Sequence, residues 1–288
     1  MNSIDKKAYA KINLGLDVLR KREDGYHEVS MIMQSVDLYD TLSLRKHTDG
    51  EIKLRTNLPW LPSDRRNLVY KAAELFRESL HIREGIHITL NKKIPVAAGM
   101  AGGSSDAAAT LAGLNQLFVA GLSDDDLKKM GVKLGADVPY CIQLGTALSE
   151  GIGELLTPLK PMPDCHILLV KPDISVSTKY VYEHLDLSDD VSHPDIPGML
   201  ASIELGNLNR LTALMDNILQ SVTIREYPII EEIKKHMLEY GALTSLMSGS
   251  GPTVFGIYDS LPAAKTAYQY FLRSGHGKTV HLTKPCWP

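Results

Sequence analysis

The sequence predicts an α+β protein built from two lobes. Three observations support this fold class: strand-like alternation in the opening third, a helical period that begins at Asn67, and strands that alternate with helices after His166. A chain of 288 residues is also long enough for two lobes of ordinary size. We expect the lobes at residues 1–155 and 156–288, and no change in composition marks their boundary.

The opening third is expected to be rich in β-structure. One side of the first strand is apolar, at Ile12, Leu14, Leu16 and Val18. Three further strands, separated by short polar turns, are predicted at residues 29–36, 41–44 and 52–55. From Asn67 the apolar residues instead fall on one helical face.

The middle of the chain reads as strand, small-residue loop and helix. The strand covers residues 86–90, the loop 95–105 and the helix 106–117. A further helix begins at Ser123, whose side chain can cap it.

The remainder alternates strands with helices. Strands are predicted at 166–170, 243–247, 253–258 and 279–282. Helices are predicted near 178–185, 209–219, 229–240 and 263–273. We expect the polar stretch 188–197 to be a surface loop.

Composition excludes several classes of function. A balance of 31 basic and 34 acidic residues lacks the basic excess typical of nucleic-acid binding. No apolar run approaches the ~20 residues of a membrane span. The first seven residues lack the apolar core of a secretory signal, and three unpaired cysteines suit a reducing compartment. We therefore expect a cytoplasmic protein that acts on small molecules, as a monomer or weak homodimer, without nucleic-acid or membrane partners.

The loop at 95–105 has the composition of a phosphate-binding loop. Gly99, Gly102 and Gly103 leave space for backbone N–H groups to surround an anion, and the following helix directs its positive end there. The Walker A and dinucleotide-binding patterns are both absent. A glycine-rich turn before a helix often serves only to reverse the chain between two elements. This loop alone therefore leaves open whether it binds phosphate or is a simple turn.

Longer motifs identify a family. Residues 95–108 resemble the ATP-binding motif of the GHMP kinase superfamily, and residues 245–255 resemble its C-terminal glycine-rich motif. Residues 8–14, 24–27 and 135–139 are similar to the 4-diphosphocytidyl-2-C-methyl-D-erythritol kinase family. The resemblance runs from residue 8 to about residue 258, with five motifs in the family's order. Met100-Ala101 departs from the Leu-Gly of many relatives, and both replacements are small or apolar.

The resemblance implies a fold and a reaction. The fold is the two-lobed GHMP kinase fold, with an N-terminal α/β nucleotide-binding lobe and a C-terminal ferredoxin-like lobe. The reaction is transfer of a phosphoryl group from ATP to the 2-hydroxyl of 4-diphosphocytidyl-2-C-methyl-D-erythritol, in the non-mevalonate route to isoprenoids. Mg²⁺ is expected with ATP, and the sequence does not identify its ligands.

The resemblance also implies the catalytic pair. Asp137 would accept the proton of the attacking hydroxyl, and Lys11 would keep that carboxylate ionised and favour the developing alkoxide. Read without the resemblance, Lys11 is a solvated strand lysine and Asp137 a turn residue before a proline.

The remaining implied contacts divide between the two substrates. The ATP contacts are Pro95, Val96, Ala97, Ala98, Gly99, Met100, Ala101, Gly102, Gly103, Ser104, Ser105, Asn67 and Lys92. The contacts to the phosphate acceptor are Asn13, Tyr26, His27, Thr178, Tyr182, Gly249 and Ser250. Tyr26 and Tyr182 would stack on the cytosine, and His27 would bind its edge.

Each implied contact has a structural alternative. Asn67 and Thr178 are candidate helix caps, and Lys92 is a candidate exposed lysine. Tyr26 and His27 could be surface residues of a hairpin.

Two rival functions remain. One is a GHMP kinase that acts on mevalonate-like or amino-acid alcohols. In such an enzyme the Tyr26-His27 pair would have no nucleotide base to bind. The other is a non-catalytic metabolite sensor, which would need neither Lys11 nor Asp137. A hydrolase nucleophile at Ser248 or Ser250 lacks the Gly-x-Ser-x-Gly spacing.

Overall fold

The computed structural model describes residues 2–188 and 191–287, which divide into two compact units. The first unit consists of Met1–Ala10, Leu38–Val96 and Ala101–Leu144. The second consists of Lys11–Asp37, Ala97–Met100 and Gly145–Pro288. The long strands β1 (Ser3–Lys21) and β2 (His27–His47) each contribute residues to both units. The lobe boundary predicted near residue 155 stays a prediction.

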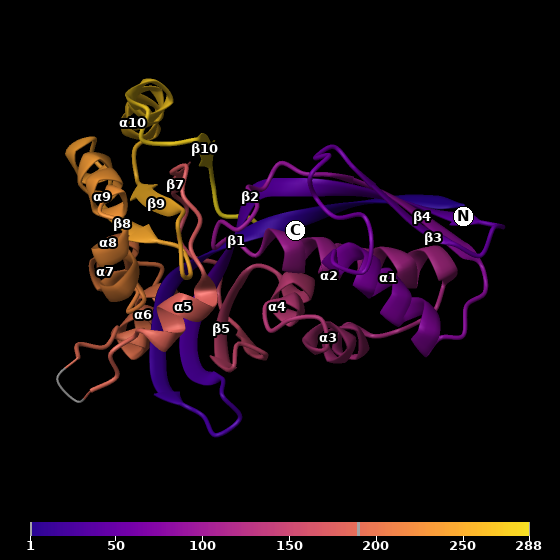
Figure 1. Ribbon diagram of the computed structural model, residues 1–288. Coiled ribbons are helices and arrows are strands. Elements are labelled where there is room, and N and C mark those ends of the chain that lie inside the picture. Colours follow the sequence, from indigo (N-terminus) through magenta and orange to yellow (C-terminus); the bar gives the residue numbers. More distant parts are fainter. Residues whose placement is uncertain (1, 189–190, 288) are drawn as a thin grey trace. The chain divides into compact units, whose positions relative to one another are not determined.

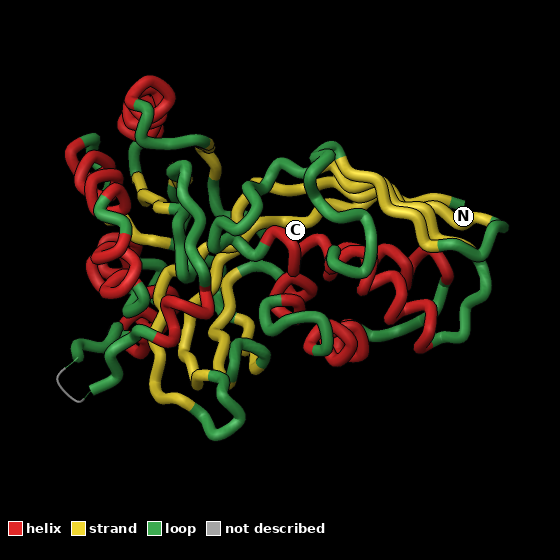
Figure 2. Tube along the Cα trace, in the orientation of Figure 1, coloured by secondary structure: helices red, strands yellow, loops and turns green. Residues whose placement is uncertain are grey.

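The first unit is a sheet covered by helices on one face, as Figures 1 and 2 show. β3 (Ile52–Thr56) pairs in parallel with β4 (Gly85–Asn91), which pairs antiparallel with the end of β2. The register aligns Ile52 with Ile86 and Thr41 with Asn91. The helices are α1 (Leu68–Ser79), α2 (Gly102–Phe118), α3 (Asp124–Val132) and α4 (Val138–Gln143).

The helix α2 is the centre of this unit. Ten of its residues are buried, six of them alanine or leucine, and the helix packs against both α1 and α4. The next helix, α3, begins as predicted, because Ser123 accepts a hydrogen bond from the Asp126 backbone N–H while the Asp126 side chain accepts one from the Ser123 N–H.

The second unit contains strands of two sheets, one of which is the six-stranded sheet that also includes β3 and β4. In one, β2 pairs with β1 and with β5 (Thr146–Gly151), and β5 pairs with β6 (Leu155–Pro158). The other holds four antiparallel strands in the order β10-β7-β9-β8. They are β7 (His166–Lys171), β8 (Thr244–Met247), β9 (Val254–Tyr258) and β10 (Thr279–Thr283).

The four-stranded sheet has the predicted ferredoxin-like topology. When its strands are numbered along the chain, their order across the sheet is 4-1-3-2. Helices lie between the first and second strands and between the third and fourth. The helices of this unit are α5 (Thr178–Glu183), α6 (Ile196–Glu204), α7 (Leu208–Leu214), α8 (Gln220–Glu226), α9 (Ile229–Glu239) and α10 (Leu261–Ser274).

Several predicted boundaries were wrong. The strands expected at 29–36 and 41–44 form one strand, β2, and α2 begins at Gly102 instead of residue 106. The expected helix at 209–219 ends at Leu214, because the backbone around Asn217 pairs with Leu16 of β1.

Some elements were missed by the sequence analysis. They are β5, β6, α4, α6 and α8. The helix α6 begins at Ile196, within the stretch 188–197 expected to be a loop, and residues 189–190 of that stretch lie outside the described residues. Within residues 2–188 and 191–287, no helix has both the length and the apolarity that a membrane crossing requires.

Candidate active site

The loop ahead of α2 has the backbone of an anion-binding turn. Ala97, Gly99 and Ala101 all adopt positive φ angles, of 52°, 72° and 54°. Ala101 occupies the N-cap position of α2, and no side chain caps the helix there. The first intrahelical bond runs from the Ser105 N–H to the Ala101 carbonyl (2.8 Å), so the N–H groups before Ser105 precede the helical ladder. An uncapped start of a 17-residue helix is a site where phosphate binds well.

Within the second unit, this loop meets the C-terminal glycine-rich segment. The Ser248 hydroxyl donates a hydrogen bond to the Gly99 carbonyl at 2.9 Å. A Cβ on Gly99 would overlap the Ser248 carbonyl oxygen and would lie 3.0 Å from that of Gly251. A Cβ on Gly249 would lie 3.2 Å from the Gly99 oxygen. Both segments therefore need glycine where their backbones approach.

Lys11 and Asn13 lie beside this meeting point. The Lys11 ammonium donates to Asn13 Oδ1 at 2.7 Å, and the Lys11 backbone N–H donates to the Met100 carbonyl at 3.2 Å. The same Asn13 oxygen would lie 3.6 Å from a Cβ on Gly249. Both side chains are buried, at 5% and 0% exposure, so Lys11 is not the solvated strand lysine of the alternative interpretation.

Asn217 holds the C-terminal glycine-rich segment in place, and sequence analysis did not identify it. Its side-chain amide donates to the carbonyls of Met247 and Gly249, both at 2.8 Å, and its side-chain oxygen accepts from the Leu219 N–H. The residue is 1% exposed. No local signal could have found it, because its partners lie 30 and 32 residues further along the chain.

Two pairs of predicted acceptor contacts come together in the second unit. The ring centroids of His27 and Tyr182 are 5.0 Å apart, at an interplanar angle of 42°. Burial, and to a lesser extent Lys21, lowers the pKa of His27. The Thr178 and Ser250 hydroxyls are hydrogen-bonded at 2.8 Å.

Two more of the predicted acceptor contacts, Tyr26 and Thr178, lie on the surface and at a helix start, respectively. The Tyr26 side chain is mostly exposed, so its stacking role stays a prediction. Thr178 is the first residue of α5, and the N-cap hydrogen bond is made by Ser177. The N-cap interpretation of Thr178 was therefore wrong.

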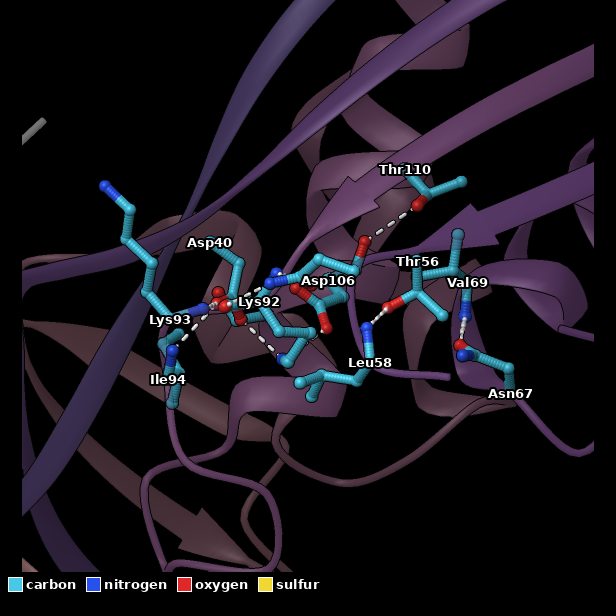
Figure 3. Close-up of polar contacts among 12 residues, drawn as sticks. Asp40, Thr56, Leu58, Asn67, Val69, Lys92, Lys93, Ile94, Asp106 and Thr110 are labelled. Carbon is cyan, nitrogen blue, oxygen red and sulfur yellow. Dashed lines mark hydrogen bonds and ion pairs between the residues drawn. The ribbon is translucent and has the colours of Figure 1, made fainter. Parts of the chain in front are cut away.

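Lys92 lies between two aspartates in the first unit (Figure 3). Its ammonium forms ion pairs with Asp40 and, at 2.6 Å, with Asp106, and all three side chains are buried. The second oxygen of Asp40 accepts from the backbone N–H groups of Lys93 and Ile94. The alternative of an exposed Lys92 was therefore wrong. Asp40 was not identified from the sequence, and its distance of 52 residues from Lys92 explains why.

This buried cluster carries two carboxylates for one ammonium. Asp106 Oδ1 is buried and has no hydrogen-bond partner. Burial is the main cause that raises the pKa of Asp106, and the neighbouring Asp40 raises it further against the opposing effect of Lys92. Protonation of Asp106 removes the surplus negative charge, which is costly to bury.

Three more of the predicted ATP contacts, Asn67, Gly102 and Gly103, also lie in the first unit. A Cβ on Gly102 would lie 3.2 Å from the Lys92 ammonium nitrogen, and a Cβ on Gly103 would lie 3.5 Å from Leu68 at the start of α1. Asn67 caps α1, because its side-chain oxygen accepts from the Val69 N–H at 3.0 Å (Figure 3). The cap and an ATP contact are compatible roles for Asn67.

Asp137 lies at the start of α4, also in the first unit. It is half-buried, occupies the N-cap position and makes no side-chain cap bond there. Gly135, two residues before it, would bring a Cβ to 3.9 Å from the Ser104 hydroxyl of α2. The neighbouring Ser105 hydroxyl donates to the Tyr9 carbonyl at 2.7 Å. Lys11 and Asp137 belong to different units, and their pairing stays a prediction.

Comparison with known proteins gives the same family along the whole chain. Residues 67–145 match the GHMP kinases N terminal domain, and residues 199–277 match the GHMP kinases C terminal domain. The 4-diphosphocytidyl-2-C-methyl-D-erythritol kinase of Lachnoclostridium phytofermentans is 55% identical over 99% of this chain and 98% of its own length. The enzyme of the same name from Lachnospira eligens is 51% identical over the full length of both chains.

A solved structure agrees with these relatives. The crystal structure of 4-(cytidine 5'-diphospho)-2C-methyl-D-erythritol kinase superposes with a TM-score of 0.84 at 31% identity, and covers 99% of this chain and 100% of its own. Similarity of this extent includes both glycine-rich segments and both units. This chain belongs to the GHMP kinases and, among them, to the 4-diphosphocytidyl-2-C-methyl-D-erythritol kinase family.

Proposed function

We propose that this chain transfers the terminal phosphoryl group of ATP to the 2-hydroxyl of 4-diphosphocytidyl-2-C-methyl-D-erythritol. Full-length identity above 50% to relatives of that name supports this reaction. The structural observation that carries it is the contact of Gly99 with Ser248, beside the buried Lys11–Asn13 pair. The product feeds the non-mevalonate route to isoprenoid precursors.

Different residues bind the phosphates and the adenosine part of ATP in this proposal. The residues 95–105, ending in the open N-terminus of α2, bind the phosphates of ATP. Asn67 and Lys92 contact the adenosine part, and Lys92 does so as a hydrogen-bond donor because its charge is already matched by two aspartates. The contact of Gly102 with Lys92 supports this arrangement.

The acceptor is held by residues of the second unit. Tyr26 and Tyr182 stack on the cytosine ring, and His27 binds its edge. Asn13, Gly249, Ser250 and Thr178 bind the diphosphate and the polyol. The mutual contacts of His27 with Tyr182 and of Thr178 with Ser250 support a common binding region.

The chemical step needs a positioned base and charge neutralisation. Asp137 accepts the proton of the 2-hydroxyl while the new O–P bond forms and the bond to ADP breaks. Lys11 stabilises negative charge on the attacking and transferred oxygens. Because the transition state of phosphoryl transfer is loose, positioning contributes more than basicity.

Mg²⁺ accompanies ATP and neutralises its phosphates in this proposal. Mg²⁺ takes oxygen ligands, usually a few from protein and the rest from phosphate and water. The Ser104 hydroxyl at the start of α2 is an oxygen donor that fits this ion. Ser104 would hold it together with the phosphates of ATP and water.

The decisive experiment is a product assay with three acceptors. The purified chain is incubated with ATP and Mg²⁺ and with the cytidyl compound, mevalonate or homoserine, and the product is identified by mass. A single added phosphate on the cytidyl compound alone is expected. Phosphorylation of mevalonate or homoserine with comparable efficiency would favour the other GHMP kinases, and retained ATP binding without any product would favour a sensor.

We also propose a cytoplasmic enzyme that is a monomer or weak homodimer and works without a nucleic-acid or membrane partner. The near balance of charge, −3 at neutral pH, and the three thiol cysteines support this assignment. Light scattering of the purified chain tests the oligomeric state.

A further inference from the structure

Two histidines and an aspartate form a cluster at the edge of the first unit. His47 ends β2, Asp49 lies in the following turn, and His87 lies near the start of β4. His47 Nδ1 is 3.1 Å from Asp49 Oδ1, and His87 Nε2 is 2.9 Å from Asp49 Oδ2. One ligand atom from each of the three residues lies within 4.8 Å of the others.

The fold holds these residues together in several ways. The antiparallel register of β2 and β4 aligns His47 with Gly85 and Arg45 with His87, so the two histidines are diagonal neighbours on one face. Their rings stack with centroids 4.0 Å apart. The Asp49 carboxylate is fixed by the Glu51 N–H at 3.1 Å. It approaches Gly85 so closely that a Cβ there would overlap it.

We propose that His47, Asp49 and His87 form a binding site for a divalent transition-metal ion such as Zn²⁺. Two imidazole nitrogens and a carboxylate oxygen are a ligand set that Zn²⁺ accepts, with water completing the tetrahedron. Two bonds of about 2.0–2.1 Å at a tetrahedral angle separate their ligand atoms by about 3.3 Å. His47 Nδ1 is 3.1 Å from Asp49 Oδ1 and His87 Nε2 is 2.9 Å from the other oxygen, Oδ2, so each nitrogen is already near this spacing from one carboxylate oxygen. One ligand atom from each of the three residues lies within 4.8 Å of the others, which small side-chain rotations bring to ligand spacing.

Three local changes accompany binding. The Asp49 backbone N–H, which donates to His47 Nδ1 at 3.3 Å, must release that nitrogen. The rings are nearly parallel, at 15°, and must turn so that both nitrogen lone pairs face the ion. Both rings are partly exposed, which leaves room for this movement. Lys53 must also leave Asp49 Oδ2, from which its ammonium is 2.5 Å away, and its side chain is 55% exposed. Lys53 therefore competes with the ion for the carboxylate.

The proposed site is separate from the candidate active site. His87 stands five residues before Lys92 along β4 and its continuation, a distance of about 17 Å for an extended chain. None of the three ligands belongs to the residues proposed to bind ATP or the acceptor. The inference therefore does not depend on the proposed function, and the kinase rate of the ligand variants without added zinc serves as a control.

The experiment measures Zn²⁺ binding to the full chain, purified without a polyhistidine tag. Isothermal titration is compared for the wild type, His47→Gln, His87→Gln, Lys53→Gln and His236→Gln. His236 is the matched control, because it forms a His–carboxylate pair with Glu239 at 2.9 Å on α9 of the second unit and belongs to a different element from the three proposed ligands. Circular dichroism verifies that each variant is folded.

We expect one Zn²⁺ per chain in the wild type and a rise in melting temperature on binding. His47→Gln and His87→Gln should each weaken binding by more than about ten-fold, since loss of even an outer partner costs that much. Lys53→Gln should strengthen binding by about two- to five-fold, and His236→Gln should leave it unchanged. The proposal would be overturned if the wild type did not bind Zn²⁺ stoichiometrically. It would also be overturned if folded His47→Gln and His87→Gln bound Zn²⁺ with the affinity of the wild type.

Discussion

The carbonyl oxygen of Ser248 occupies the space that any Cβ on Gly99 would need, while the Ser248 hydroxyl donates to the Gly99 carbonyl. This relationship joins two glycine-rich segments that are 149 residues apart in the sequence. Each segment therefore constrains the backbone of the other, because neither can move without breaking this contact.

Gly99→Ala is expected to destabilise the protein more than a glycine substitution with the same backbone strain. Gly121 is the matched control, because its φ of 70° is close to the 72° of Gly99 and nothing lies within 4 Å of its would-be Cβ. Gly121→Ala should cost about 1–2 kcal/mol through left-handed strain alone. Gly99→Ala adds a backbone overlap and should also weaken ATP binding. Urea unfolding measures the free energy of unfolding of both variants. Equal losses in Gly99→Ala and Gly121→Ala would contradict the close contact of Gly99 with Ser248.

Lys92→Met should reduce the free energy of unfolding by about 3–5 kcal/mol, because it leaves two buried carboxylates without their cation. Lys71→Met, on the exposed side of α1, should change it by less than about 0.5 kcal/mol. Chemical denaturation measures both values. A loss below about 1 kcal/mol for Lys92→Met would show that the aspartates do not depend on this ammonium.

Asp106→Asn should flatten the pH dependence of stability. Burial and the nearby Asp40 raise the pKa of Asp106 from 3.8 to about 8 in the folded protein, against the effect of Lys92. Between these values the folded chain keeps a proton that the unfolded chain releases, so this group's contribution is present at low pH and is lost as pH rises toward 8. The slope is at most about 1.4 kcal/mol per pH unit.

Melting temperatures of the wild type and Asp106→Asn across this pH range provide the measurement. The two curves should converge at acid pH, where both side chains are neutral. An unchanged slope in the variant would mean that Asp106 is ionised when folded.

Tyr182→Ala should raise the KM for the cytidyl substrate by an amount equivalent to about 1–3 kcal/mol and leave the KM for ATP unchanged, because an aromatic face stacked on a base is lost. Tyr180→Ala is the control on the same helix, since Tyr180 stacks on His184 instead of His27. Steady-state kinetics with each substrate varied in turn separates the two. Equal effects of both variants would argue against base stacking by Tyr182.

Asp137→Asn should lower kcat by about 10²–10⁴-fold while ATP affinity is retained, as expected for loss of a positioned base. Asp125→Asn, a strongly exposed carboxylate on α3, should have no effect. Single-turnover rates and calorimetric ATP binding test the pair. A kcat within about ten-fold of the wild type would assign the proton to another acceptor.

Local sequence patterns predicted much of the fold. Ser123 capped its helix, the helix at Asn67 began as expected, and the ferredoxin-like order followed from the family resemblance and the later strand–helix alternation. The two helix starts depend on side chains within a few residues of one another, so a short window of sequence contains their cause, whereas the strand order came from the resemblance.

Elements that depend on distant partners were not predictable in this way. The helix predicted at 209–219 stops at Leu214 because the following backbone pairs with Leu16 of β1. The helix propensity of that stretch was overridden by hydrogen bonds to a strand some 200 residues earlier in the chain.

By itself, the sequence determined the family, the reaction that we propose and the residue types at the glycine-rich loops. Only the tertiary structure decided that Lys92 is neutralised by Asp40 and Asp106, that Asn217 holds the Met247 and Gly249 carbonyls, and that two histidines share Asp49. The physical reason is that burial and charge pairing arise between residues far apart in the chain. Their energies depend on distances that folding sets.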